Sequence, residues 1–456
     1  MGRGLAGLPG CPVRRGRGRA RRSPAVVFEE GDALTYGELD RLSNQAARFL
    51  LARGLRRGDL VCLCLEKGPA AYALVLGCLK AGMPYFAVDP AGPEPRLESI
   101  LAQCPPALVF SEVPGKAAAW AAKTVACPVG SASFCSGLDA SAFEAADPPA
   151  PSDAAYVMFT SGSTGVPKGA VMSHGNLLTF VDWAEGAYGF GPSDRHTHLN
   201  PLYFDNSVFD MYSTFFTGGA LVPFATRLVQ DPFAAVERAE KLRCTVWFSV
   251  PSMLLFLQAT RALEKGSLPA MRKIIFGGEG YPKARLAELF ALLGDRIELV
   301  NVYGPTECTC ICSSYSLSVA DFADLSGFPP IGSLTWPFGG RLLDGDRPVA
   351  PGEVGELCLG GPCVGHGYYN RPELTRTAFV QNPANAAYEE RLYRTGDLMR
   401  LGADGKLWFV GRKDFQVKHQ GYRVELEEVQ HALAKSPGVT EAAVLQAFEE
   451  GASRLV

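Results

Sequence analysis

The sequence predicts an α/β fold in which helices cover parallel sheets. Apolar runs typical of buried strands alternate along the chain with segments whose apolar residues recur at helical spacing. Hydrophobic residues make up 47% of the 456 residues, which is enough for large cores, and this length indicates roughly two to four folding units. Several apolar runs end in polar, glycine-containing loops, and ligands of α/β sheets gather at such strand ends.

The first regular elements lie between residues 34 and 90. Residues 34–50 have helical spacing, with Thr35 as the expected N-cap and Glu38 three residues later, as in a capping box. The elements that follow are a strand over 59–65, a helix over 70–81 and a strand within 84–90. Residues 112–153 are rich in Ala, Pro and Ser, and we expect a connector there.

The middle of the chain continues the alternation. A strand is expected over 154–159, and a helix should open near residue 173. Asp205 precedes a second helical pattern, where it could simply cap the helix. Further buried strands are expected at 245–252, 273–280 and 296–300. Cys308, Cys310 and Cys312 alternate, so we expect them to share one face of a strand.

The last third of the chain predicts shorter helices and strands. Alternating apolar residues and glycines over 355–375 indicate a strand pair with a tight turn. Residues 425–433 have the pattern of an amphipathic helix, and 439–445 that of a strand.

Composition excludes several classes of protein. A net charge of −3 argues against a general binder of polyanions such as nucleic acid. No apolar run reaches the roughly 18 residues of a membrane helix, so no membrane partner is expected. The 13 cysteines include no CxxC pair, which argues against a zinc site and favours a reduced, cytoplasmic location.

The first 25 residues differ from the rest, because six arginines between residues 14 and 22 stand among glycines, and no acidic residue occurs in this stretch. A disordered leader or a misassigned start is the favoured interpretation. An organellar targeting segment is an alternative, although glycines make a poor amphipathic helix. A nucleic-acid arm is the third, although no aromatic residues are interleaved.

Residues 160–169 form the segment with the strongest chemical signal. Its sequence, Thr-Ser-Gly-Ser-Thr-Gly-Val-Pro-Lys-Gly, follows a predicted strand and combines hydroxyl groups, glycines and Lys168. Backbone N–H groups of such a loop can converge on an anion, and the lysine adds positive charge, so a phosphate chain is the expected ligand. The alternative is a flexible Ser/Gly turn with a solvated lysine; the spacing is not that of a Walker loop.

This loop resembles the phosphate loop of the adenylate-forming (AMP-binding) superfamily. Other stretches match the family in order, among them 301–307 (Asn-Val-Tyr-Gly-Pro-Thr-Glu), 355–375, 393–397 (Tyr-Arg-Thr-Gly-Asp) and 411–425. The likeness covers about residues 26–456 and is greatest to amino-acid-activating adenylation domains of nonribosomal peptide synthetases and to D-alanine–carrier protein ligases.

The resemblance implies a domain organisation. A large AMP-binding domain over 26–413, made of helix-covered mixed and parallel sheets with a small β-barrel-like subdomain, would follow the 1–25 leader. Residues 414–456 would form an incomplete α+β C-terminal subdomain, with Asp414 at the hinge. That subdomain normally continues to a lysine that bridges carboxylate and phosphate, which is absent here. A shortened protein, a fragmentary gene prediction or a degenerate enzyme would each explain this, and we expect weakened adenylation with retained ligand binding.

The resemblance also assigns the nucleotide site. Tyr303 would stack near the adenine, Thr306 would contact the phosphoryl region, Glu307 would help hold Mg²⁺, and Asp397 would accept the ribose hydroxyls. Without the family, Glu307 could be an exposed residue after a Gly-Pro turn, and Asp397 could cap its own turn. The catalytic residues are expected to be Lys168, Thr306, Glu307 and Arg412. The nucleotide-binding residues are expected to be Thr160, Ser161, Gly162, Ser163, Thr164, Gly165, Gly278, Glu279, Asn301, Tyr303, Gly304, Asp397 and Arg412.

Asp205 is the main clue to the substrate. It lies where amino-acid-activating members place an aspartate that pairs with the substrate's α-ammonium, and a buried carboxylate needs such a partner. The expected pocket consists of Asp205, Asn206, Phe209, Ser249, Ile275, Gly277, Val302, Cys310 and Ile311. No second charge is present in this set, which favours a small or medium, uncharged amino acid. D-alanine ligases have a cysteine where this chain has Gly277.

The implied reaction joins an amino acid to ATP, giving an aminoacyl-adenylate and pyrophosphate, with Mg²⁺ as cofactor. A phosphopantetheine thiol on a peptidyl or D-alanyl carrier protein would then accept the aminoacyl group, after a hinge motion of the small subdomain. The alternatives are an acyl- or aryl-CoA synthetase, which would not need Asp205, and a pseudoenzyme that binds nucleotide or amino acid without turnover.

Overall fold

The computed structural model describes residues 19–29, 31–113, 124–127, 131–161, 167–334, 336–414, 416–419, 422–434, 436, 439, 442–449 and 452–456. The chain forms two compact units. Unit 1 consists of Met1–Phe159, Gly169–Asp231 and Lys241–Val246, and unit 2 of Thr160–Lys168, Pro232–Glu240 and Trp247–Val456. The segment 160–168 therefore belongs to unit 2, whereas the strands on either side of it lie mainly in unit 1.

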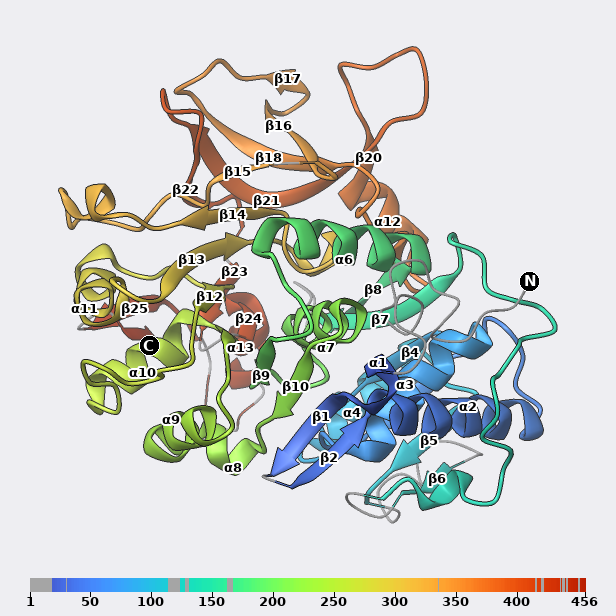
Figure 1. The fold of residues 1–456 in the computed structure, drawn as a ribbon. Coiled ribbons are helices and arrows are strands. Elements are labelled where there is room, and N and C mark those ends of the chain that lie inside the picture. Colours follow the sequence, from blue (N-terminus) through green and yellow to red (C-terminus); the bar gives the residue numbers. More distant parts are fainter. Residues whose placement is uncertain are drawn as a thin grey trace. The chain divides into compact units, whose positions relative to one another are not determined.

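One sheet of unit 1 is built from short, buried parallel strands. Its order is β8–β7–β4–β3–β5–β6, and the pairs β3–β4, β3–β5, β4–β7 and β5–β6 are parallel (Figure 1). The strands are β3 (Val61–Cys64), β4 (Tyr85–Ala87), β5 (Leu108–Ser111), β6 (Thr124–Ala126), β7 (Ala154–Thr160) and β8 (Lys168–Ser173). This confirms the expected strands near 61, 85 and 154, and it adds β6 and the 3₁₀ turn Ser133–Cys135 within the predicted connector.

The second set of strands in unit 1 has the order β9–β10–β1–β2. Strands β9 (Arg195–His198), β10 (Ala220–Pro223) and β1 (Pro24–Glu29) are parallel, and β2 (Asp32–Thr35) is antiparallel to β1. The helix α1 (Arg19–Arg22) and the start of β1 fall inside the stretch expected as a leader, whose first 18 residues lie outside the described part.

Two helices of unit 1 begin where the sequence predicted. The helix α2 (Tyr36–Ala52) has the capping box of Thr35 and Glu38, and it packs against α3 (Pro69–Ala81). The helix α6 (His174–Tyr188) has Ser173 as N-cap, with Asn176 completing a second capping box. The remaining helices are α4 (Glu94–Gln103), α7 (Asn206–Thr217) and α8 (Thr226–Val229).

Unit 2 contains the strand order β11–β12–β13–β14–β15. Strands β12 (Lys273–Gly277) and β13 (Glu298–Tyr303) are parallel, and β14 (Ser313–Ser316) and β15 (Ser333–Leu334) continue antiparallel from β13. The strand β11 is Val246–Ser249, and the helices are α9 (Pro232–Lys241), α10 (Pro251–Ala259) and α11 (Lys283–Leu293).

Two expectations in this part of the chain were wrong. The strand predicted to end at residue 300 continues through Tyr303, because Asn301, Val302 and Tyr303 pair with β12 or β14. The three alternating cysteines do not share a strand. Cys308 ends the 3₁₀ turn η4 (Thr306–Cys308), and Cys310 has a positive φ of 74°, so the backbone turns sharply between them.

An antiparallel sheet of order β17–β16–β18–β21–β20, with β22 paired to β21, follows in unit 2. Its strands are β16 (Gly339–Asp344), β17 (Arg347–Pro348), β18 (Val354–Gly360), β20 (Phe379–Gln381), β21 (Arg391–Leu401) and β22 (Leu407–Arg412). The strand pair predicted within 355–375 was wrong, since β18 pairs with β16 and β21. The segment after β18 holds β19 (Gly367–Tyr368) and α12 (Pro372–Ala378).

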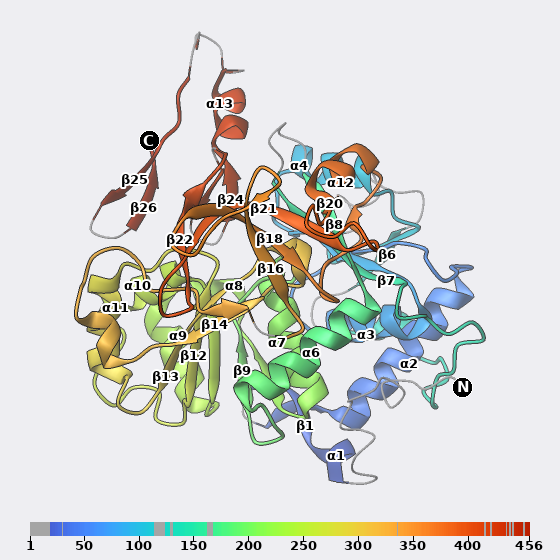
Figure 2. The ribbon, with the colours of Figure 1, turned by 90° about the horizontal axis from the view of Figure 1, so that it is seen from above.

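The described C-terminal residues form two hairpins and a helix. The hairpin of β23 (Gln416–His419) and β24 (Tyr422–Glu425) leads into α13 (Leu426–Ala434), as the helical pattern predicted. Of the strand expected over 439–445, residues 440 and 441 lie outside the described part, the others are not in a strand, and the next strand begins at residue 446. There β25 (Gln446–Glu449) pairs with β26 (Ala452–Leu455) (Figure 2).

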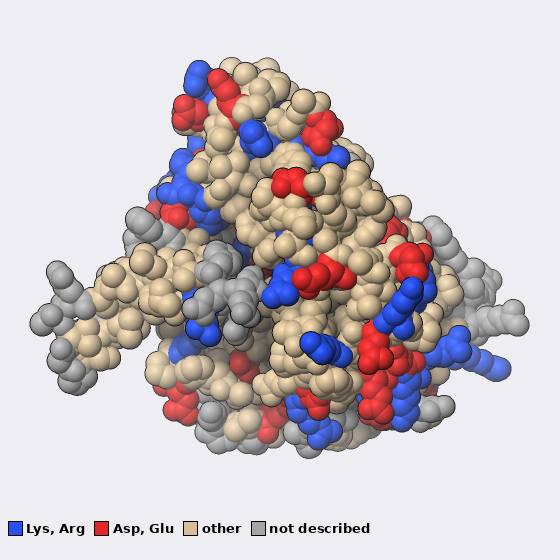
Figure 3. Space-filling view, turned by 90° about the vertical axis from the view of Figure 1, so that its left-hand side faces the viewer, with Lys and Arg blue, Asp and Glu red and all other residues tan. Residues whose placement is uncertain are grey.

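The distribution of charge on the surface and the character of the helices add two observations. Basic and acidic side chains are interspersed among uncharged residues on the face shown in Figure 3, as expected from the small net charge. Among the described helices, none has the length and apolar character needed to cross a membrane.

Candidate functional site

A bulge in β21 places the Asp397 carboxylate. The segment of β21 from Arg394 to Leu398 advances by four residues, while the paired segment of β18 advances by two. The pairing register therefore shifts at this point. Gly396 has φ of +73°, and an added Cβ would lie 2.7 Å from Nη2 of Arg412, so glycine suits both the backbone and the space. The turn expected before Asp397 is therefore a bulge inside a long strand.

The hydroxyl of Thr395 fixes this bulge. Its Oγ1 donates to the carbonyl of Leu357 at 2.7 Å and accepts from the Asp397 N–H at 3.0 Å. Because both contacts involve backbone atoms, they fix the backbone of Asp397 within the sheet.

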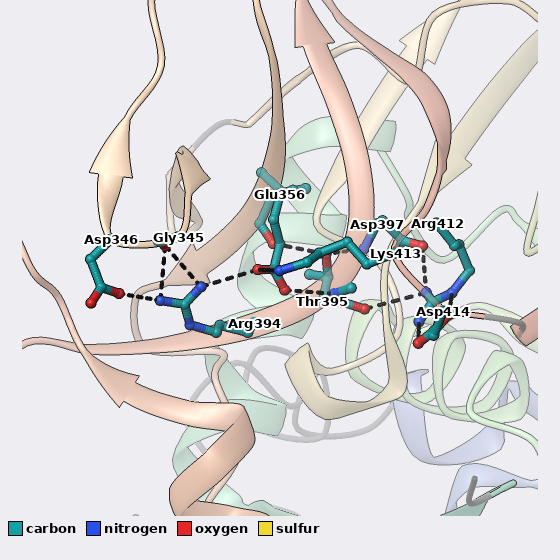
Figure 4. Close-up of polar contacts among 11 residues, drawn as sticks. Gly345, Asp346, Glu356, Arg394, Thr395, Asp397, Arg412, Lys413 and Asp414 are labelled. Carbon is teal, nitrogen blue, oxygen red and sulfur yellow. Dashed lines mark hydrogen bonds and ion pairs between the residues drawn. The ribbon is translucent and has the colours of Figure 1, made fainter.

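The Asp397 carboxylate has a different partner on each oxygen. The Tyr303 hydroxyl donates to Oδ2 at 2.5 Å. Nη1 of Arg412 donates to Oδ1 at 2.5 Å (Figure 4). The Asp397 side chain is 5% exposed. Burial, and then the negative charge of Asp397, raise the pKa of Tyr303 well above its usual value, so its hydroxyl stays a donor. A carboxylate has about four acceptor positions, so each oxygen retains capacity for a further donor.

Arg412 links two carboxylates. Its Nε and Nη2 donate to Asp414 at 2.6 and 2.7 Å as a fork, and Nη1 reaches both Asp397 and the carbonyl of Thr395 (Figure 4). Forked guanidinium–carboxylate pairs fix orientation as well as charge. The predicted hinge residue Asp414, whose side chain is 47% exposed, thus holds the expected catalytic Arg412.

Glu356 supports the bulge from β18, and the sequence reasoning did not single it out. Its carboxylate accepts from Arg394 at 3.1 Å, Lys413 at 3.2 Å and the Gly396 N–H at 3.1 Å (Figure 4). The signal that could have found it is a charged residue in an otherwise apolar strand, because a buried carboxylate requires partners.

Glu307 is fully buried in η4. Its Oε1 accepts from the Tyr368 hydroxyl at 2.8 Å, and Nζ of Lys168 lies 5.6 Å from the centre of the Tyr368 ring. The structure therefore brings the predicted Lys168 and Glu307 to the same tyrosine, another residue that the sequence reasoning missed. Thr306, the expected phosphoryl contact, precedes Glu307 in the same turn and is partly exposed.

The chemistry of these donors fits Mg²⁺ bound together with phosphate. Among the described residues, no group of three or more His, Cys, Asp and Glu side chains could hold a metal ion. Mg²⁺ in nucleotide sites uses one or two carboxylates, water and phosphate oxygens, so a single carboxylate suffices. Glu307 would provide that carboxylate.

The phosphate loop is described only at its ends. Thr160 Oγ1 lies 3.5 Å from the carbonyl of Lys168, and the buried Ser161 Oγ has no hydrogen-bond partner within the described ranges. The expected nucleotide-binding residues between them, Gly162, Ser163, Thr164 and Gly165, lie outside the described residues.

Four other predicted nucleotide-binding residues lie at the ends of β12 and β13. Glu279 accepts from the Ser252 N–H at 3.0 Å, and Asn301 donates to the carbonyl of Pro330 at 2.9 Å. Both side chains have structural partners, and their contact with nucleotide stays a prediction. Gly278 follows β12, and Gly304 follows β13.

Three predicted pocket residues belong to unit 1. Asp205 is the N-cap residue of α7, and its side chain makes no capping hydrogen bond to the helix. Asn206 begins α7 and is partly exposed. Phe209 is fully buried, and its ring packs against those of Phe180, Tyr188 and Phe190.

The other six lie in unit 2, at or near the carboxyl ends of β11, β12 and β13. They are Ser249, Ile275, Gly277, Val302, Cys310 and Ile311. A Cβ on Gly277 would lie 2.3 Å from the carbonyl of Val302, so this position admits only glycine without rearrangement. That the residues of both units line one pocket stays a prediction.

Comparison with known proteins decides the family. Residues 14–369 match the family model described as AMP-binding enzyme. The chain belongs to the AMP-binding enzyme family. This confirms the predicted resemblance and the predicted enzyme class.

Curated relatives of this AMP-binding enzyme match nearly the whole chain. An L-proline–[L-prolyl-carrier protein] ligase of Streptomyces coelicolor is 33% identical over 446 residues, covering 93% of this chain and 82% of the relative. A ligase of the same name from Pseudomonas fluorescens is 34% identical, covering 94% and 84%. Tyrocidine synthase 3 of Brevibacillus parabrevis is 33% identical over 92% of this chain, a match that spans 6% of the synthase.

Solved structures confirm the predicted fold class. The chain is similar to holo-PA1221, described as a nonribosomal peptide synthetase protein containing adenylation and PCP domains, with a TM-score of 0.82 and 25% identity over 95% of this chain and 73% of that one. The crystal structure of IdnL1 gives a TM-score of 0.81 with 29% identity, covering 96% and 88%.

Proposed function

We propose that this AMP-binding enzyme activates a small or medium, uncharged amino acid with ATP and transfers it to the phosphopantetheine thiol of a carrier protein. The single observation that carries the proposal is the position of Asp205 at the start of α7, where the resemblance places the aspartate that pairs with the substrate's ammonium group. A carboxylate in that position suits a ligand ammonium group. The carrier-protein ligases among the relatives support the same reaction.

The nucleotide is assigned to the residues around Asp397. The remaining acceptor positions of its carboxylate would receive the two ribose hydroxyls, while Tyr303 and Arg412 keep the carboxylate in place. Lys168 would supply positive charge to the phosphates together with the loop 160–165. Glu307 would hold Mg²⁺, which neutralises charge on the phosphates when bound.

The proposed chemistry proceeds in two displacements. A carboxylate oxygen of the amino acid attacks the α-phosphorus of ATP, the bond to the bridging oxygen breaks, and pyrophosphate leaves with that electron pair. The thiol then loses its proton to solvent or a base, its sulfur attacks the acyl carbon, and AMP leaves. This chain's residues would mainly orient the two anions and stabilise the developing charge.

The side-chain class follows from the predicted pocket. Asp205 is the only charged residue in the predicted set, and most of the other members are apolar or small. L-Proline, named for two relatives, belongs to this class and is a natural first candidate.

A pyrophosphate-exchange assay over the twenty L-amino acids, with acetate and benzoate as plain carboxylates, tests the proposal. We expect exchange with one or a few uncharged amino acids and none with the plain carboxylates. The Asp205→Ala variant should lose amino-acid-dependent exchange. Exchange with a plain carboxylate that survives Asp205→Ala would instead identify an acyl- or aryl-CoA synthetase.

A further inference from the structure

Lys67 lies beyond the carboxyl end of β3, and its ammonium bonds to three backbone carbonyls. Its Nζ donates at 2.8 Å to the carbonyls of His198, Leu199 and Phe224. An ammonium has three N–H groups, so this arrangement uses every donor of Lys67. A lysine with that set of partners holds backbone in place and forms no ion pair through these bonds.

The three carbonyls belong to neighbouring strand ends. His198 ends β9, Phe224 follows β10, and the Phe224 N–H donates to the His198 carbonyl at 3.0 Å. β9 and β10 run parallel, so Lys67 bonds to both of them at their carboxyl ends. The chain that leaves β9 there reaches Asp205 within seven residues of His198.

Two further side chains hold the segment 199–205. Asn200 donates to Asp210 of α7 at 2.8 Å. The Ser207 hydroxyl lies 2.6 Å from the carbonyl of Phe204 and 3.2 Å from that of Leu202. The segment is thus fixed at its beginning by Lys67, in its middle by Asn200 and at its end by Ser207.

The energetic argument favours Lys67 as the main support. Hydrogen bonds to charged groups stabilise roughly twice as much as neutral ones. The bonds of Lys67 also meet at a single atom, so losing the ammonium releases three backbone groups together. The position of the Asp205 side chain depends on this backbone, because the start of α7 is set by the segment that leads into it.

We infer that Lys67 is a positioning residue for substrate recognition: by holding the carboxyl ends of β9 and β10, it sets where Asp205 stands and so determines the affinity for the amino acid. This rests on the proposed function, in which Asp205 pairs with the substrate's ammonium group. Lys67 itself touches no reacting atom. Its removal should weaken amino-acid binding and leave ATP binding unchanged.

Unit 1 offers a matched control. Lys80 also makes at least three hydrogen bonds, at 2.7 Å, to Asp40, Ser43 and Asn44, and its side chain is 2% exposed. These bonds join α3 to α2 and do not involve the segment before α7. Lys80→Met should therefore lower the melting temperature at least as much as Lys67→Met, without changing amino-acid affinity.

The experiment is isothermal titration with the amino acid that gives the strongest exchange signal, and separately with ATP and Mg²⁺. We expect Lys67→Met to raise the Kd of the amino acid about 10- to 100-fold, the effect of losing one or two charge-assisted hydrogen bonds, and to change that of ATP less than about twofold. Ser207→Ala, a smaller change that should fold even if Lys67→Met does not, should raise the amino-acid Kd about fivefold.

Three results would overturn the inference. They are an unchanged amino-acid Kd in both variants, an equal loss of amino-acid and ATP affinity, and an equal effect from Lys80→Met. Failure of the proposed function has a different signature, because the unaltered protein would then show neither amino-acid binding nor amino-acid-dependent exchange, and the inference would fall with it.

Discussion

The two regions assigned to ligands are held together in different ways. In unit 1, side chains of Lys67 and Ser207 bond to backbone carbonyls of the segment before Asp205. In unit 2, Asp397 is held by other side chains, chiefly Tyr303 and Arg412, and Arg412 is held in turn by Asp414. Backbone bonds preset a position, whereas bonds between side chains can be exchanged when a ligand arrives. The comparison therefore predicts a preset amino-acid anchor and an adaptable nucleotide site.

The largest effect is expected from Asp397→Ala. This change removes the proposed ribose acceptor and leaves Arg412 and Tyr303 without their shared partner. Two charge-assisted hydrogen bonds at about 1.5 kcal/mol each correspond to more than about a 100-fold loss of ATP affinity. Titration with ATP and Mg²⁺ measures it. Asp346→Ala is the control, because that carboxylate is exposed and pairs with Arg394, at the outer edge of the same network.

Glu356→Ala should have the next largest effect, on stability. Removing this carboxylate leaves the Gly396 N–H without an acceptor and takes a partner from Arg394 and Lys413. Because both cations remain partly exposed, the free energy of unfolding should fall by about 2 kcal/mol, less than for a fully buried pair. Urea denaturation measures this loss. Glu353→Ala, at an exposed glutamate, is the control and should change the urea midpoint little. Equal losses of unfolding free energy in the two variants would mean that the network does not support the bulge.

A pH series separates the two regions directly. Burial lowers the pKa of Lys67 to about 7, while the charges of Asp210 and Glu66 act in the opposite direction. Below that pKa the ammonium can bond all three carbonyls, and above it the neutral amine has only two N–H groups. Amino-acid affinity should therefore fall up to about tenfold between about pH 6.5 and 8.5, since one hydrogen bond contributes about 1.5 kcal/mol.

The same series has an internal control. The Arg412 guanidinium cannot lose its proton in this range, so ATP affinity should not follow the amino-acid curve. A Lys67→Arg variant should likewise show no such fall. If the affinities of the unaltered protein for the amino acid and for ATP fell in parallel with pH, the proposed difference between the two regions would be contradicted.

The smallest effect is expected from Tyr368→Phe. The change removes one hydrogen bond to the buried Glu307 and keeps the ring beside Lys168. Exchange activity should fall about three- to tenfold, with a higher Mg²⁺ requirement, because Glu307 loses its orientation but not its charge. The Mg²⁺ dependence of exchange is the measurement. Tyr388→Phe, at an exposed tyrosine, should leave the Mg²⁺ dependence of exchange unchanged.

Local signals predicted most of the secondary structure. The capping box of Thr35 and Glu38 predicted one helix start, and a second helix was expected to open near residue 173; the structure confirms both, because capping depends on residues within one turn. The strand near 154–159 was likewise visible from its apolar run. The motif residues Tyr303, Asp397 and Arg412 were named from resemblance, and the structure brings them together in unit 2.

Sequence alone determined the helix starts, the alternation of strands and helices, and the residue types able to bind phosphate, a metal ion or an ammonium group. Only the tertiary structure decided that β21 bulges between Arg394 and Leu398, that the cysteines near 310 leave the strand, and that Glu356 and Tyr368 support the site. It also decided the partners of Lys67, which lie far away in the sequence, at His198, Leu199 and Phe224. The physical reason is range: caps and periodicity act within a few residues, whereas strand register and carbonyl partners depend on segments that meet only after folding.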